Sequence, residues 1–341
     1  MSEAMANLSK LRQLLQSDPR VANSRPVKLS NVLQQFVAAN EDASRSANFA
    51  SQAPDDVRDV VELVGNVQAM ASDDLALRVL KTLKILSRKY ENRIRLGELV
   101  VADLVRVLGE DRPSAVLGEA ANVVLNVCYE RDNVARIIAA GGVPPLIGLL
   151  SSTELDLQAN AAGAIQSICF QTEGRSYVRE MGAIPAVLPL LSSPSLKVQT
   201  RAVGAVHNIS SEPEAIRLIR RLEGIAPLIV LLRTPSASVC GSAAGALQNL
   251  SRETTARREI RDLGAVVPLS DLLFGDDVQS QVCAAGALLN LLGPELGAET
   301  ESNVKRQGFK KLLSLALTIG MVTEPLRAQQ LEMQGTQPEQ A

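Results

Sequence analysis

The stretch GALQNLS at residues 245–251 has four close counterparts along the chain. The five aligned segments are VVLNVC (123–128), AIQSIC (164–169), AVHNIS (205–210), ALQNLS (246–251) and ALLNLL (287–292). Their fourth residues, which we call the ladder positions, are Asn126, Ser167, Asn208, Asn249 and Asn290, each 41 residues after the one before. A fixed period of this length predicts a helical solenoid in which each repeat stacks on the next.

A second pattern lies between these segments. It reads GGVPPLIGLLSS (141–152), GAIPAVLPLLSS (182–193), EGIAPLIVLLRT (223–234) and GAVVPLSDLLFG (264–275). Glycine accepts the positive φ that ends a helix, and proline fits the first turn of the next helix because it has no N–H to satisfy. Each period therefore predicts a short first helix, a glycine-proline corner, a second helix and a longer third helix.

The two ends of the chain differ from this array. One period before Asn126, Ile85 marks a less typical unit near residues 56–97, so about six units are expected over residues 56–308. Residues 1–55 are interpreted as an N-terminal segment of short helices and a polar linker. Residues 309–324 are expected to form a capping helix, because a terminal repeat would otherwise expose its apolar face, and residues 325–341 a disordered tail.

The composition favours packed helices. Hydrophobic residues make up 46% of the chain but aromatic residues only 2%, and tryptophan is absent. Aliphatic side chains without large rings suit closely packed helices better than a β-sandwich. The formal net charge of −2 supplies no basic field, so we expect no nucleic acid as a partner.

The location that these features predict is the cytoplasm. The first residues lack a secretory signal pattern, and no apolar stretch is long enough for membrane insertion. The four cysteines lie in apolar stretches without a CxxC pair, which is typical of reduced thiols.

The third-helix pattern A-x-G-A-x-x-N-[LI]-S and the corner G-[AVG]-[IV]-x-P-L resemble the armadillo repeat family over residues 56–308. HEAT repeats, the nearest structural alternative, usually carry two helices per unit and lack this corner. The resemblance implies an all-α fold, a right-handed superhelical solenoid of armadillo repeats whose third helices line a concave groove.

In that family the ladder asparagine holds the backbone of an extended peptide, since an amide offers both a donor and an acceptor. The resemblance thus implies a ladder of Asn126, Asn208, Asn249 and Asn290, interrupted by Ser167. The alternative interpretation is that these amides hydrogen-bond to neighbouring third helices within the solenoid.

Four residues before the ladder position, the nuclear-import adaptors of the family place tryptophan, which packs against a bound lysine. The residues here are Asn122, Gly163, Gly204, Gly245 and Gly286. Glycine cannot form that pocket, so an import adaptor is not expected. Close packing between adjacent helices is a better interpretation of the glycines than a groove opened for a ligand.

Charged residues complete the candidate groove. Glu130, Glu212 and Glu253 follow the ladder by one helical turn and predict either a mildly acidic edge that favours a basic partner or simply solvated helix ends. Arg201, on the third helix that ends after Asn208, is the remaining candidate groove residue.

Catalysis is not expected. His207 is the only histidine, which excludes multi-histidine metal sites, and we expect no Ser-His or Cys-His catalytic arrangement. No phosphate-binding or HExxH motif occurs. We therefore predict a non-enzymatic scaffold that binds extended or helical segments of other proteins, without cofactor, metal, nucleic acid or small-molecule substrate. The specific roles left open are a cytoskeletal or ciliary assembly component, an Hsp70-type chaperone cofactor and a substrate-binding adaptor of a ubiquitin ligase. An unfamiliar enzyme is the remote alternative.

Overall fold

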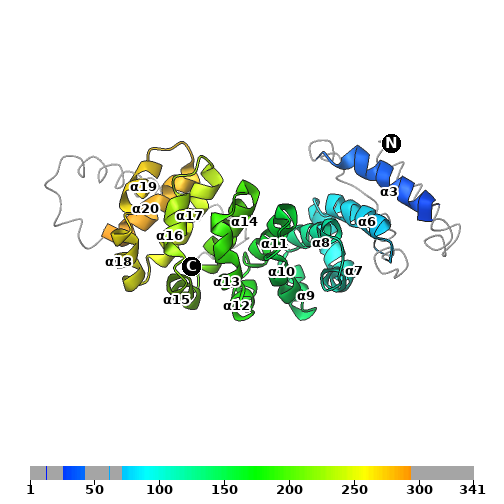
Figure 1. Cartoon of the computed structure of the whole chain (residues 1–341), viewed down its shortest axis with the longest axis horizontal. Helices are drawn as coiled ribbons and strands as arrows, with labels where there is room; N and C mark the ends of the chain where they lie inside the picture. The colour runs from blue at the N-terminus through cyan, green and yellow to red at the C-terminus, as the bar shows by residue number, and fades with distance from the viewer. Residues whose placement is uncertain (1–12, 14–25, 43–60, 62–70, 293–341) are drawn as a thin grey trace, which may run out of the picture. The chain divides into compact units, whose positions relative to one another are not determined.

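The computed structural model describes residues 26–42 and 71–292, together with residues 13 and 61 (Figure 1). The expected capping helix at 309–324, the tail at 325–341 and most of the segment 1–55 lie outside the described residues. Within the described residues every regular element is a helix. The chain divides into two compact units, residues 1–209 and 210–341, which are described separately.

The first unit holds the helices of the earlier repeats. They are α3 (Pro26–Asn40), α6 (Asp73–Leu86), α7 (Tyr90–Leu108), α8 (Ser114–Val127), α9 (Arg131–Ala139), α10 (Val143–Leu149), α11 (Leu155–Ile168), α12 (Thr172–Glu180), α13 (Ala183–Val187), the 3-10 helix η2 (Leu188–Ser192) and α14 (Leu196–Ile209). The helices described in the second unit are α15 (Pro213–Arg221), α16 (Ile225–Leu231), α17 (Ala237–Leu250), α18 (Thr254–Asp262), α19 (Val266–Leu272) and α20 (Val278–Leu292).

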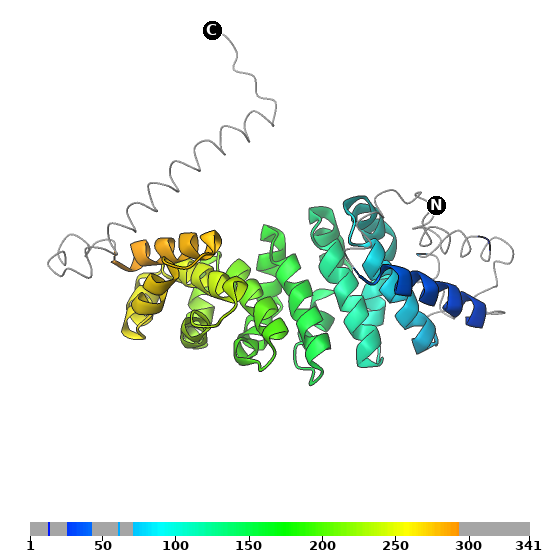
Figure 2. The ribbon, with the colours of Figure 1, turned by 90° about the horizontal axis from the view of Figure 1, so that it is seen from above.

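The repeat unit is the predicted one of three helices. The third helices α6, α8, α11 and α14 contact one another in chain order, and Figure 2 shows them side by side; in the second unit α17 contacts α20 in the same way. Their facing sides carry small buried residues such as Ala161, Ala162 and Ala205, which let the helix axes approach closely. The all-α solenoid is therefore confirmed. No helix in the described ranges has the length and apolarity needed to cross a membrane.

One repeat lacks the corner. Helix α7 runs without a break for 19 residues, through the place where the following repeats change from the first to the second helix. The positions that correspond to Gly141, Gly142 and Pro144 are here Val100, Val101 and Asp103. None of these favours positive φ or removes an N–H, so nothing ends the helix.

The other corners depend on one backbone torsion that recurs with the sequence period. Gly141, Gly182 and Gly264 have φ of 74°, 79° and 77°, in the left-handed region. The equivalent residue of the remaining repeat is Glu223, with φ of 59°. The corner thus imposes the same left-handed turn whether or not glycine is present, and Glu223 bears a strain that the glycines do not.

This strain yields a prediction. Replacing Glu223 with glycine is expected to raise the free energy of unfolding by about 1 kcal/mol, because an L-residue in the left-handed region costs roughly 1–2 kcal/mol and glycine adopts it freely. The matched control is Gly182→Ala, since a β-carbon there would meet no atom within 4 Å and any loss of stability arises from the torsion alone. Urea denaturation measures the stability of both variants. Equal denaturation midpoints for wild type, Glu223→Gly and Gly182→Ala would contradict the prediction that the left-handed torsion costs stability.

Helix α3 covers the outer side of α6. Leu29, Leu33 and Phe36 are each 0% exposed, and α3 makes its principal contacts with α6. At the C-terminal end of α3, the Arg88 guanidinium donates to the carbonyl oxygens of Asn40 and Glu41, both at 2.9 Å. These bonds satisfy carbonyls that the helix leaves unpaired, so the helix end is capped by the repeat on which it packs.

Candidate partner-binding site: the ladder face

The candidate site is built on the third helices. We define the ladder face as the residues at the ladder position of each third helix and at one, four and seven residues before it. Asn126, Ser167 and Asn208 lie at the C-terminal ends of α8, α11 and α14 in the first unit, and Asn249 and Asn290 near those of α17 and α20 in the second. Asn249 and Ser167 are only 8% and 7% exposed, whereas the other three side chains are half-buried.

The ladder amides donate to the preceding third helix. Asn126 Nδ2 lies 2.9 Å from Ser87 Oγ and 3.4 Å from the carbonyl oxygen of Lys84. Asn290 Nδ2 repeats this pair of contacts with Ser251 Oγ at 3.0 Å and the carbonyl oxygen of Gln248 at 3.2 Å. The alternative interpretation, in which the amides hydrogen-bond within the solenoid, is therefore confirmed for these residues.

The serine partners follow the same period. Asn249 Nδ2 donates to Ser210 Oγ at 3.2 Å, so Ser87, Ser210 and Ser251 form an equivalent set, and each is 0% exposed. The corresponding residues of the two middle repeats are Cys128 and Cys169. Asn208 Nδ2 donates to the carbonyl oxygen of Gln166 at 3.0 Å.

These bonds change what the ladder offers a partner. At Asn126 and Asn290 the donor side of the carboxamide is engaged inside the protein. No described residue donates to the Oδ1 of either side chain. The two asparagines therefore present an acceptor for a partner N–H, rather than the donor-acceptor clamp that the resemblance implies.

The glycines of the third helices are sites of close packing. A β-carbon at Gly163 would lie 2.4 Å from Leu125 Cδ1, and one at Gly204 would lie 2.2 Å from Gln166 Nε2. The same distance of 2.2 Å separates a β-carbon at Gly286 from Gln248 Nε2. The side chain just before each ladder position thus lies over the glycine of the next repeat, and the packing interpretation is confirmed at these three positions.

Arg201, a candidate groove residue, stands seven residues before Asn208 on α14 and so belongs to the ladder face as defined. Its Cδ is 3.3 Å from where a β-carbon of Gly163 would stand, so its stem crosses from α14 to α11. Its Nη1 is 3.5 Å from Gln166 Oε1, which is at the limit of a hydrogen bond. The guanidinium is therefore held over α11 by packing more than by polar contacts.

The predicted acidic edge is largely neutralised. Glu130, Glu212 and Glu253 are the N-cap residues of the first helices α9, α15 and α18, where the partial positive charge of the helix terminus favours a carboxylate. Glu130 also pairs with Arg93 Nε at 2.7 Å, and Glu253 with Arg220 Nε at 3.2 Å. These two carboxylates add little net charge to the edge of the face.

Sequence reasoning missed two basic residues near the candidate groove, Arg93 and Lys84, and the residues that they contact. Arg93 lies between two aromatic rings, with its guanidinium carbon 5.9 Å from the centre of Tyr90 and 5.5 Å from that of Tyr129. On the ladder face, Lys84 pairs with Glu119 at 2.9 Å between α6 and α8. The available signal was positional, since Lys84 stands one period before Leu125.

The remaining reactive groups are structural. All four cysteines are buried and free, and burial raises the pKa of the Cys128 and Cys283 thiols. Burial lowers the pKa of the His207 imidazole, which favours its neutral form. Among the described residues no group of three or more His, Cys, Asp or Glu side chains is placed to hold a metal ion.

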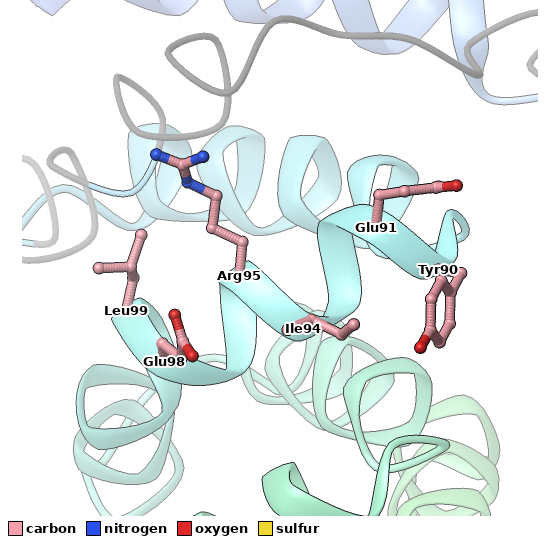
Figure 3. Close-up of a pocket in the computed structure, with 6 residues that line it drawn as sticks. All are labelled: Tyr90, Glu91, Ile94, Arg95, Glu98 and Leu99. Atoms are coloured by element: carbon pink, nitrogen blue, oxygen red, sulfur yellow. The ribbon is translucent and has the colours of Figure 1, made fainter.

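A hollow of about 500 Å³ lies along α7 and is lined by residues of that helix alone among those described (Figure 3). The lining residues are Tyr90, Glu91, Ile94, Arg95, Glu98 and Leu99. This set contains no pairing of a nucleophile with a base, so it does not form a catalytic constellation.

The comparisons with known proteins agree with this geometry. The model of the Armadillo/beta-catenin-like repeat matches residues 131–170, 171–211 and 212–252. No curated protein matches the sequence. The chain belongs to the armadillo repeat family.

Several solved structures of similar fold are engineered or designed proteins. One engineered protein of the Northeast Structural Genomics Consortium is 30% identical, with 70% of this chain and 97% of that chain covered and a TM-score of 0.63. Another from the same consortium is 27% identical over 70% and 99% of the two chains, with a TM-score of 0.64. A designed armadillo repeat protein in complex with peptide (KR)4 is 24% identical over 69% and 99%, with a TM-score of 0.61.

Proposed function

We propose that this chain is a non-catalytic protein-binding scaffold that holds segments of partner proteins on the ladder face of its third helices. The observation that carries the proposal is the carboxamide oxygen of Asn126 and of Asn290. It accepts no hydrogen bond from a described residue, and the same amide donates hydrogen bonds to the preceding helix, which hold it in place. An oriented acceptor on a repeated surface suits the N–H groups of an extended chain. The peptide-bound designed neighbour supports the proposal at the level of the fold.

The test must separate the loss of the oxygen from the loss of the internal hydrogen bond. In the binding variant, Asn126→Ala and Asn290→Ala remove both the carboxamide oxygen and the internal hydrogen bond at each position. In the control variant, Ser87→Ala and Ser251→Ala remove the hydroxyl acceptors but leave the carboxamides in place. Partner proteins purified with each form are compared, after circular dichroism has shown equal helicity. We expect the binding variant to lose partners that the control retains, and loss of the same partners from both would contradict a binding role for the ladder oxygens.

As a more specific role, we propose a structural or assembly component of a cytoskeletal or ciliary complex in the cytoplasm. A solenoid that presents a long partner-binding face suits stable docking in such a complex, and fractionation with the detergent-insoluble cytoskeleton or axoneme tests this role. Accelerated nucleotide release from Hsp70 would instead indicate a chaperone cofactor. Co-purification with a ubiquitin ligase would indicate a substrate-binding adaptor.

A further inference from the structure

The charges of the ladder face in the first unit do not cancel. Two ion pairs involve residues of this face: Arg78 with Asp74 at 3.0 Å, and Lys84 with Glu119 at 2.9 Å. Two cations are left over. They are Lys81 on α6 and Arg201 on α14, and neither forms an ion pair with any described residue.

Both unpaired cations lie in register with the ladder. Lys81 stands four residues before Ile85, so it occupies the row that continues as Asn122 on α8 and Gly163 on α11. The Arg201 guanidinium belongs to the same row, because its stem lies against Gly163, with Nε 3.4 Å from where a β-carbon would stand. The row therefore begins and ends with a positive charge.

Polar groups without charge lie between the two cations. Asn122 and Asn126 are half-buried on α8, and the Oδ1 of Asn126 accepts no hydrogen bond within the described residues. Asn160 on α11 is tied to the carbonyl oxygen of Gly118 at 3.0 Å and fixes the spacing of α8 and α11. The row thus offers a cation, an acceptor for backbone N–H groups and a second cation.

The spacing of the row sets the length of a matching ligand. Adjacent helices pack about 10 Å apart, so the α6 and α11 positions are separated by roughly 20 Å. An extended chain rises about 3.3 Å per residue and spans that distance in about six residues. We propose that the first unit binds an extended, acidic protein segment with two carboxylates about six residues apart, one at Lys81 and one at Arg201.

This inference rests on the proposed function and sharpens it by naming the charge of the partner. One of the two interpretations of the sequence was an acidic edge that favours a basic partner, but Glu130 pairs with Arg93 and Glu253 pairs with Arg220. A carboxylate brought to Lys81 or Arg201 meets a cation that no described acidic side chain neutralises, while a basic segment is repelled at both ends of the row.

The test uses the full-length chain and a library of random 14-residue peptides displayed on phage. Selected peptides are sequenced, synthesised with a fluorescent label, and titrated by fluorescence anisotropy. We expect enrichment of Asp or Glu at two places five to seven residues apart. Replacing both acids with Gln is expected to weaken binding at least tenfold, and raising the salt concentration from 50 to about 500 mM is expected to weaken it as well.

Variants of the protein assign the two cations. Lys81→Glu and Arg201→Glu are each expected to lower the affinity for the selected peptides about tenfold. If either of these variants does not fold, Lys81→Gln or Arg201→Gln removes the charge without reversing it. Arg131→Glu is the control, because Arg131 is a 71% exposed arginine on α9, outside the ladder face, and carries the same change of charge. Binding that responds equally to the control variant would overturn the assignment.

The outcomes also separate this inference from the proposed function. Basic or neutral peptides whose binding is lost in Asn126→Ala would overturn the acidic partner but leave the scaffold function standing. A selection that yields no peptide dependent on Asn126, Lys81 or Arg201 would count against both.

Discussion

Replacement of Gly174 with alanine is expected to lower the free energy of unfolding by about 3 kcal/mol, as for other insertions into closely packed regions. A β-carbon at this position would lie 2.0 Å from the carbonyl oxygen of Ile168 and 2.8 Å from its carbonyl carbon. Backbone atoms cannot rotate out of the way as a side chain can, so α12 must move away from the end of α11. The equivalent residues of the next two repeats are Ala215 and Ala256, which shows that the close approach is particular to this repeat.

The matched control is Gly148→Ala in α10. A β-carbon there would meet no atom within 4 Å, and the residue is helical, so alanine is expected to stabilise the protein by up to about 1 kcal/mol through its higher helix propensity. Urea denaturation followed by circular dichroism measures both variants. If the Gly174→Ala protein is as stable as the wild type, α12 can move away from α11 without a loss of stability, which would contradict the prediction.

The second large effect is expected for Phe36→Ala. The ring is fully buried between α3 and the repeat that it covers, and removal of a buried aromatic side chain typically costs about 3–5 kcal/mol. Because each element of a repeat protein is stabilised mainly by its neighbours, we expect α3 to detach while the later repeats stay folded.

Hydrogen exchange with mass spectrometry locates this change. Peptides that cover α3 are expected to exchange at least tenfold faster, peptides of α6 moderately faster, and those of α11 and α14 at the wild-type rate. Gln34→Ala, at an exposed position of the same helix, serves as the control. Equal acceleration throughout the first unit would mean that it unfolds as a single cooperative body.

The repeat architecture was predictable from sequence because its determinants are themselves periodic. Ladder asparagines and corner glycines recur every 41 residues, which fixes the number and order of helices in each repeat. The exceptions arise where the periodic residue is missing. Val100 and Val101 let α7 continue through its corner, whereas Glu223 is forced into the left-handed torsion by the packing of the helices on either side.

The candidate site was predictable as a set of positions but not as a set of interactions. The sequence places Asn126 and Glu130 on or beside the groove, but their partners Ser87 and Arg93 lie 39 and 37 residues earlier, in the preceding repeat. The direction of a side chain across a repeat boundary decides whether an amide faces the neighbouring helix or a ligand. A single sequence does not reveal that direction. Whether Lys81 forms an ion pair with another described residue likewise depends on the direction of the acidic side chains around it.

The cross-helix amide bonds also determine how the first unit would respond to a stretching force. Between α6 and α8, the hydrogen bond from Asn126 to Ser87 lies near the C-terminal ends of the helices. Between α11 and α14, the hydrogen bond from Asn208 to the carbonyl oxygen of Gln166 lies at the equivalent place. At the joint between α8 and α11 the ladder residue is Ser167, and the tie is made by Asn160, in the middle of its helix. The α8–α11 joint therefore lacks the amide bond that the other two joints have near the C-terminal ends of their helices. Under tension along the stack we expect this joint to begin to open at that end, so the serine in the ladder determines where the unit first yields.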